Sequence, residues 1–185
     1  MDLDTGLERK FARFGEGLTV QDGKTIEGYA SLFGSCDQGG DIVQKGAYAA
    51  SLKSLVASSR KVKMLWQHDP SQPIGIWDDV SEDANGLFVR GRLLDRVEKG
   101  REAAALIEAG AIDGLSIGYR TVKATKNDKG QRLLTELELW EVSLVTFPML
   151  PSARVAAKGD DPTEDILREL AVAFQGARQN LTHLV

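Results

Sequence analysis

The chain has 185 residues, 42% of them hydrophobic, and carries 23 basic and 27 acidic side chains, giving a formal net charge of −4. This length predicts one domain of ordinary core size, and the scattered charges indicate neither nucleic acid nor a membrane as a partner. No apolar run reaches the roughly 20 residues of a membrane span and the first residues lack a secretory signal, so we expect a cytoplasmic protein.

The first third of the chain predicts an arm, a strand and a helix. Residues 1–20 mix charges with isolated apolar side chains and are interpreted as a flexible arm, with a mobile stretch or short helix over residues 1–17. Residues 25–33 are predicted to form a strand that leads into a glycine-rich loop. Residues 45–57 have apolar side chains at helical spacing and predict an amphipathic helix, with Tyr48, Leu52, Leu55 and Val56 on its apolar face.

The lone cysteine lies in the glycine-rich loop. Cys36 excludes an intramolecular disulfide and a cysteine-based zinc site, and its neighbours predict a passive thiol. We therefore expect neither a metal nor another cofactor.

One of the two histidines follows a short alternating stretch. Residues 62–68 alternate with a period of two, which predicts a strand and puts His68 in phase with the apolar side chains. His68 is therefore expected to point inward at the end of the strand. Residues 69–73 are expected to end this strand, because Pro70 and Pro73 cannot donate to a ladder.

A hairpin and a second helix are predicted next. Residues 74–80 and 86–94 are interpreted as strands joined by an Asn-Gly turn, which is a strong hairpin signal. Residues 96–109 are rich in helix-forming side chains and stop at Gly110, a common helix terminator, so they predict a helix.

The two strands predicted after this helix carry a serine and a carboxylate. Residues 115–122 alternate so that Ser116 shares a face with Gly118, where a missing side chain leaves room for a substrate or another chain. Residues 131–147 predict a long strand in which Glu141 falls in the apolar register, while the two other glutamates of this stretch fall opposite. A carboxylate buried without a partner costs several kcal/mol, so Glu141 needs a histidine or an arginine nearby.

The end of the chain predicts a separate segment. Residues 158–185 are interpreted as a linker and a C-terminal amphipathic helix with a loose tail, since Asp161, Pro162 and Glu164 form a good helix start. Residues 21–157 would then be the folded domain, mainly β with flanking helices.

A serine motif in the middle of the chain raises the question of nucleophilic catalysis. The segment Gly114-Leu-Ser116-Ile-Gly118 matches the nucleophile elbow of α/β-hydrolases, but that elbow needs a strand before the serine and a helix after it. Here the predicted order is reversed. The remaining hypothesis is a triad in which His68 is the base for Ser116 and Glu141 orients the imidazole.

Simpler interpretations of the same residues stay open. A strand serine is often only a small residue, and an inward histidine is often a hydrogen-bonded core residue. Arg120 and Arg154 are candidate oxyanion donors, together with backbone amides of the turn after the last strand. Either arginine could instead be a structural ion partner of Glu141.

Five segments, in this order and at compatible spacing, resemble the prohead (capsid maturation) proteases of tailed bacteriophages, a family related to the herpesvirus assembly proteases. Together they cover about residues 25–156, and the histidine, serine and acid of the family align with His68, Ser116 and Glu141. One departure is the absence of the family's frequent Pro-Ala-Asn after the last strand. The segments are Glu27-Gly-Tyr-Ala-Ser-Leu-Phe33, Gly40-Asp-Ile-Val-Gln-Lys-Gly-Ala-Tyr48, Leu65-Trp-Gln-His68 with Pro73-Ile-Gly75, Gly114-Leu-Ser-Ile-Gly-Tyr119 and Trp140-Glu-Val-Ser-Leu-Val-Thr-Phe-Pro148.

The resemblance implies a herpesvirus-protease-like β-barrel surrounded by helices, with residues 21–157 as a serine protease domain. It implies an endopeptidase that cleaves the scaffold segment of the major capsid protein, and itself, inside the immature capsid in the bacterial host cytoplasm. Self-association as a dimer or larger assembly is also implied. Two alternatives remain open, a non-catalytic capsid-assembly scaffold module and a general esterase or amidase.

Overall fold

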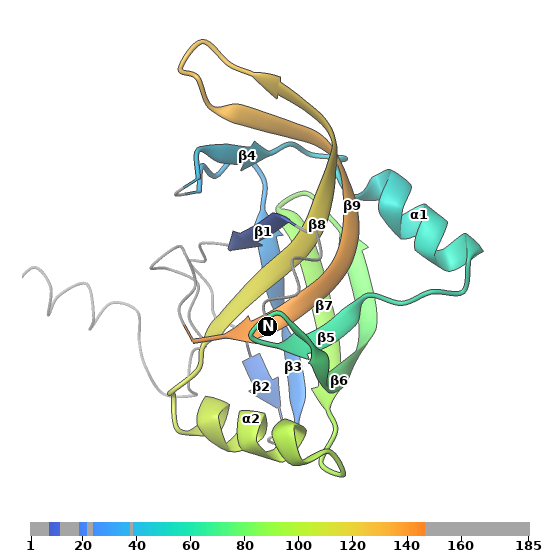
Figure 1. Ribbon diagram of the computed structural model, residues 1–185, viewed down its shortest axis with the longest axis vertical. Coiled ribbons are helices and arrows are strands. Elements are labelled where there is room, and N and C mark those ends of the chain that lie inside the picture. Colours follow the sequence, from blue (N-terminus) through green and yellow to red (C-terminus); the bar gives the residue numbers. More distant parts are fainter. Residues whose placement is uncertain (1–7, 12–18, 22–23, 38, 147–185) are drawn as a thin grey trace, which may run out of the picture.

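The computed structural model describes residues 8–11, 19–21, 24–37 and 39–146 (Figure 1). No helix within these ranges is long and apolar enough to cross a membrane. The elements in chain order are β1 (Glu8–Phe11), β2 (Thr19–Gln21), β3 (Thr25–Leu32), β4 (Asp41–Val43), α1 (Ala49–Ala57), β5 (Lys63–Trp66), β6 (Asp69–Glu82), β7 (Gly86–Leu93), α2 (Glu98–Glu108), β8 (Gly114–Lys126) and β9 (Arg132–Val145).

All described strands belong to one sheet that curls into a half-barrel (Figure 1). Its order is β1-β8-β9-β5-β6-β7-β3-β2, with β4 pairing in parallel to β9 outside this path. Because the sheet is strongly curved, β3 comes into contact with β8 and β1 near the opposite end of the strand order. The predicted mainly β fold with flanking helices is confirmed.

The concave side of the sheet is packed with apolar side chains. Strands β8 and β9 supply many of them, and both strands are buried on both faces where residues 114–119 and 141–145 are buried without interruption. Each large apolar side chain buried in this way contributes about 1.5–3 kcal/mol. The resulting hydrophobic core packs against the two strands that carry Ser116 and Glu141. Its fully or almost fully buried residues include Ile26, Val89, Ile117, Tyr119, Leu139, Val142 and Leu144.

Two described helices pack against this sheet. Helix α1 contacts β9 and β6, and α2 contacts β6 and β7. Helix α1 begins at Ala49, later than the predicted residue 45, because residues 45–48 form a turn in which Gly46 has a φ of 89°. The side chain of Glu82 accepts hydrogen bonds from the Gly46 and Tyr48 amides and ties this turn to β6.

The expectation that residues 69–73 end a strand is wrong. Strand β5 stops at Trp66, and Asp69 already pairs with it at the start of β6. Pro70 and Pro73 are tolerated because the β5–β6 register shifts beside Leu65, which interrupts the ladder where proline has no hydrogen to donate. His68 consequently lies in a two-residue hairpin turn and not at the end of a strand.

The expectation for residues 1–17 is also corrected, since Glu8–Phe11 forms a strand. Strand β1 pairs antiparallel with β8, so that Glu8 faces Tyr119 and Phe11 faces Ser116. Four residues have no pattern strong enough to identify a strand, because its hydrogen bonds come from a partner more than 100 residues away. The predicted linker and helix at residues 158–185 lie outside the described residues.

Candidate active site

The turn between β5 and β6 holds His68 in an unusual backbone conformation. Gln67 and His68 have φ values of 51° and 61°, in the left-handed region that two-residue hairpin turns use. This conformation costs roughly 1–2 kcal/mol per residue other than glycine. Strand β9 compensates, because the Gln67 amide donates to the Leu144 carbonyl at 2.9 Å and the Gln67 side chain bonds with Thr146 in both directions.

The imidazole of His68 lies between a hydroxyl and a carboxylate. Its Nε2 is 2.6 Å from Ser116 Oγ, and its Nδ1 is 2.5 Å from Glu141 Oε1. An ionised carboxylate can only accept, so it keeps a proton on Nδ1 and leaves Nε2 free to accept from the Ser116 hydroxyl. The exposed fractions are 9% for His68, 0% for Ser116 and 5% for Glu141, which places all three polar groups in a dry environment.

A second serine on β9 completes this hydrogen-bonded chain. Ser143 Oγ donates to Glu141 Oε2 at 2.5 Å and accepts from the His68 amide at 3.3 Å. One hydroxyl therefore contacts both the acid and the strained turn. Sequence reasoning did not single out Ser143, although its position two residues after Glu141, on the same face of the strand, was a usable signal.

Gly118 on β8 lies directly opposite Glu141 on β9. A Cβ atom at Gly118 would come within 2.1 Å of Glu141 Oε1. The room beside Ser116 is therefore filled by the carboxylate, and the expectation that it receives a substrate or another chain is corrected. Burial of Glu141 is possible because glycine makes room for it and because His68 and Ser143 bond to both of its oxygens.

The candidate oxyanion donors lie elsewhere or outside the described residues. The Arg120 guanidinium lies over the Trp140 ring, 4.7 Å from its centroid, and Nη1 is 4.0 Å from Glu138 Oε2. In the structure Glu141 pairs with His68, so the alternative that it serves as an ion partner of Arg120 is not observed. Arg154 lies outside the described residues.

The described ranges contain no group of three or more histidine, cysteine, aspartate or glutamate side chains able to hold a metal ion. Cys36 is an exposed free thiol whose Sγ accepts a hydrogen bond from the Gln131 side chain. The chemistry available at the buried centre is thus that of a hydroxyl hydrogen-bonded to an oriented imidazole, an arrangement suited to nucleophilic attack on a carbonyl carbon.

Comparison with solved structures finds the same fold in a phage protein. The capsid assembly protease of bacteriophage T4 superposes with a TM-score of 0.60 at 22% identity, covering 77% of this chain and 98% of the T4 chain. The varicella-zoster virus protease gives a TM-score of 0.39 at 14% identity, over 71% of this chain and 62% of the other.

Comparison of sequences is more specific. The prohead protease of Enterobacteria phage HK97 is 36% identical over 151 residues. The match covers 78% of this chain and 66% of the HK97 protein, so the chain spans just under two thirds of that relative. The family model of the caudovirus prohead serine protease matches residues 15–165. This match includes the strands and the turn that carry His68, Ser116 and Glu141, and the chain belongs to the caudovirus prohead serine protease family.

Proposed function

We propose that this chain is a serine endopeptidase of phage prohead maturation, with Ser116 as nucleophile, His68 as general base and Glu141 as the acid that orients it. The observation that supports the proposal best is the unbroken chain of contacts from Ser116 Oγ through the imidazole to the Glu141 carboxylate, at 2.6 and 2.5 Å. Family membership supports the same reaction class.

The proposed reaction proceeds by acyl transfer. Ser116 Oγ attacks the scissile carbonyl carbon while His68 Nε2 takes the hydroxyl proton, and the resulting imidazolium is stabilised by the charge of Glu141. His68 then gives this proton to the leaving amine as the C–N bond breaks. A water molecule, deprotonated by His68, hydrolyses the acyl-enzyme and regenerates the serine. Acid–base catalysis of this kind contributes roughly 10² to 10⁴ in rate.

The oxyanion of the tetrahedral intermediate needs donors. Backbone amides that follow β9, together with Arg120 and Arg154, remain our candidates. Arg120 can serve only if its guanidinium leaves Glu138 and Trp140, because one guanidinium cannot hold both positions.

The proposed substrate follows from the relatives. The HK97 relative is named a prohead protease and the T4 neighbour a capsid assembly protease. We infer that this chain cleaves the scaffold segment of the major capsid protein, and itself, inside the immature capsid in the host cytoplasm. Self-association, as a dimer or a larger assembly, would be favoured there because confinement raises the effective concentration.

The test is intact-mass analysis of the major capsid protein after co-expression with this chain. Wild type is expected to trim the capsid protein, Ser116→Ala to leave it whole, and Glu141→Gln to trim it far more slowly. If shells form and wild type leaves the capsid protein uncut, the proposal is wrong and a non-catalytic assembly module replaces it. Cleavage of small acyl esters, with no effect on the capsid protein, would instead indicate a general esterase.

A further inference from the structure

The nucleophile strand has a neighbour on each side near Ser116. Strand β9 pairs with one edge of β8, and the N-terminal strand β1 pairs with the other. The β1 register runs from Glu8 opposite Tyr119 to Phe11 opposite Ser116. Ser116, next to this pairing, has 0% exposure, so its hydroxyl is covered in this structure.

Without β1, the outer edge of β8 would present unpaired backbone groups beside the serine. Such an edge is a template for an extended peptide, because main-chain hydrogen bonds align the added strand. A protease needs this kind of alignment, since the scissile carbonyl must be held close to the attacking oxygen. The position that β1 occupies is thus one where an extended substrate would have to lie.

We propose that β1 is an intramolecular plug, a segment of the chain that docks on the β8 edge at residues 116–119 and must leave before an extended peptide can reach Ser116. This inference rests on the proposed function, because it assigns the regulation of the same serine. It also identifies the kind of partner that this edge fits, which is a peptide in extended conformation.

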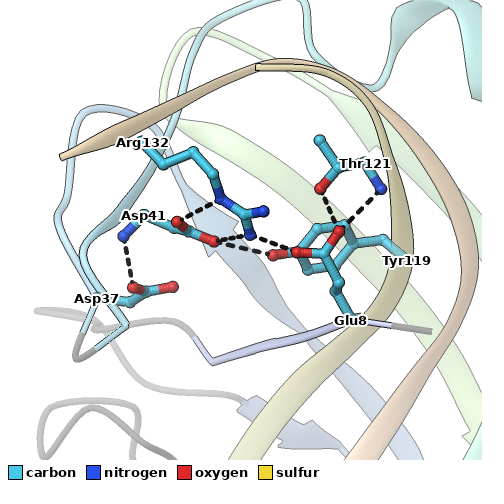
Figure 2. A network of polar contacts seen from close by, with 6 residues as sticks. All are labelled: Glu8, Asp37, Asp41, Tyr119, Thr121 and Arg132. Carbon is cyan, nitrogen blue, oxygen red and sulfur yellow. Dashed lines mark hydrogen bonds and ion pairs between the residues drawn. The ribbon is translucent and has the colours of Figure 1, made fainter. Parts of the chain in front are cut away.

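A polar network holds the plug in register (Figure 2). The Glu8 carboxylate accepts hydrogen bonds from the Thr121 amide at 3.2 Å and the Thr121 hydroxyl at 2.5 Å, and it forms an ion pair with Arg132. With Glu8 fixed beside Tyr119, antiparallel pairing leads the β1 backbone along β8 until Phe11 faces Ser116. The side chain of Glu8 therefore sets which residues of the plug lie at the nucleophile.

The other end of the network is built from the fold itself. The Arg132 guanidinium donates two hydrogen bonds to the Asp41 carboxylate, from Nε to Oδ1 at 2.8 Å and from Nη2 to Oδ2 at 2.6 Å. The Asp41 amide donates to Asp37 Oδ1 at 2.8 Å, and the Tyr119 hydroxyl lies 3.4 Å from Asp41 Oδ2. Arg132 is thus oriented by Asp41 whether or not Glu8 is present, so a binding site for the Glu8 carboxylate persists when β1 leaves.

The ion pair between Glu8 and Arg132, which anchors β1, is weak enough to let β1 leave the β8 edge. The side chains of Glu8 and Arg132 are 36% and 38% exposed, and both line an open pocket of about 530 Å³. Water and salt therefore weaken their attraction. Because β1 has only four residues, it adds few ladder bonds to this pair. We therefore expect β1 to dissociate from the β8 edge without unfolding of the rest of the sheet.

The experiment uses the full chain with two readouts on Glu8→Ala. The first is the rate at which a β-lactone acylates Ser116, followed by intact mass, and the second is hydrogen exchange of the β8 amides at residues 116–119. We expect Ser116 of Glu8→Ala to be acylated at least about fivefold faster than in wild type, because loss of a weak ion pair raises the population of the state without β1 on the edge. The β8 amides of this variant should also be less protected from exchange. Glu136→Gln is the matched control, because it removes an ion pair with Lys123 on the same hairpin, and it should behave as wild type.

A second variant covers the case in which Glu8→Ala does not fold. Lys10 and Ile117 lie directly opposite each other, so Lys10→Cys with Ile117→Cys, in a Cys36→Ser background, staples β1 to β8 when oxidised. The oxidised form should be acylated several times more slowly than its own reduced form. Equal rates before and after reduction would overturn the proposal.

The remaining outcomes separate the two hypotheses. Two results for Glu8→Ala would contradict the plug proposal and leave the proposed capsid-protein cleavage untouched. In one, the acylation rate and the exchange protection are both unchanged; in the other, exchange protection alone changes while Ser116 is acylated at the wild-type rate. If no form is acylated and none cleaves capsid protein, yet exchange at the β8 edge responds to Glu8→Ala, the proposed function fails while docking of β1 on that edge is supported.

Discussion

Gly118 lies opposite Glu141 across the β8–β9 ladder, and the Glu141 carboxylate fills the space that a side chain at position 118 would take. The acid is thereby held in line with His68 Nδ1 at 2.5 Å. A glycine in the middle of a strand is thus required by the geometry of the buried acid, and not by a turn.

We predict that Gly118→Ala moves the Glu141 carboxylate and misorients His68. A displacement of about 1 Å can cost 10²-fold in rate, so kcat/KM for capsid-protein cleavage should fall by about that factor. Steady-state cleavage of purified capsid protein measures it. Gly39→Ala is the matched control, because its Cβ meets nothing closer than 3.3 Å, and it should keep wild-type activity. Wild-type kcat/KM in Gly118→Ala would contradict the role assigned to this contact.

We predict that Ser143→Ala lowers kcat about tenfold and leaves KM nearly unchanged. Ser143 positions the acid and the turn without a direct role in chemistry, and each hydrogen bond to a charged group is worth about 1.5–3 kcal/mol. Ser51→Ala is the control, since this buried serine accepts from the Leu139 amide at 2.9 Å on the same strand. It should lose stability and retain kcat. An equal fall in kcat for both variants would mean that Ser143 is only structural.

We predict that Gln67→Gly is more stable than Gln67→Ala by about 1 kcal/mol, because glycine adopts a positive φ without steric cost. Both variants lose the hydrogen bonds to Thr146, so their difference isolates the backbone conformation. Urea denaturation measures the free energy of unfolding of each. Equal stability would show that the turn holds no such strain.

We predict that β1 docking weakens in acid. Burial alone would raise the pKa of Glu8, but hydrogen bonds from Thr121 and Arg132 outweigh it and hold the pKa below the ordinary value of 4.5. A lowered folded-state pKa means that this stabilisation is complete above 4.5 and is lost as the pH falls through the lower value. The other charged or titratable groups of the network are Arg132, Asp41, Asp37 and Tyr119, and the pKa of Tyr119 is raised by burial.

The measurement for this pH effect is the exchange protection factor of residues 116–119, which corrects for the intrinsic pH dependence of exchange. Protection should decline below pH 4.5 in wild type. Glu8→Gln, which cannot ionise, should show lower protection at neutral pH and a flatter profile. An identical decline in both proteins would assign the effect to another group, such as Asp41.

Local pattern was sufficient for much of the fold. The period of two identified the strands that became β5, β8 and β9. It also selected Glu141 over its neighbouring glutamates, and Glu141 is buried with 5% exposure. The expected register is wrong, however, because a register shift between Leu139 and Glu141 puts Glu141 on the face of Ser116 and Gly118 and not on the face of Leu139. Short-range signals carry information about side-chain direction only between such irregularities, because strict alternation is interrupted at each register shift. They also marked Ser116 and His68, which the structure brings into contact.

Two features depended on partners distant in sequence. The left-handed turn at His68 is held by Leu144 and Thr146, and β1 is held by its pairing with strand β8. Neither has a local signature, since each joins segments that meet only when the sheet closes. Ser143 differs, because its bond to Glu141 joins residues two apart on one strand. Sequence by itself therefore identified the candidate site residues and the family that the chain resembles. The tertiary structure alone decided that β1 takes the edge of β8 beside Ser116, because this pairing joins segments more than 100 residues apart.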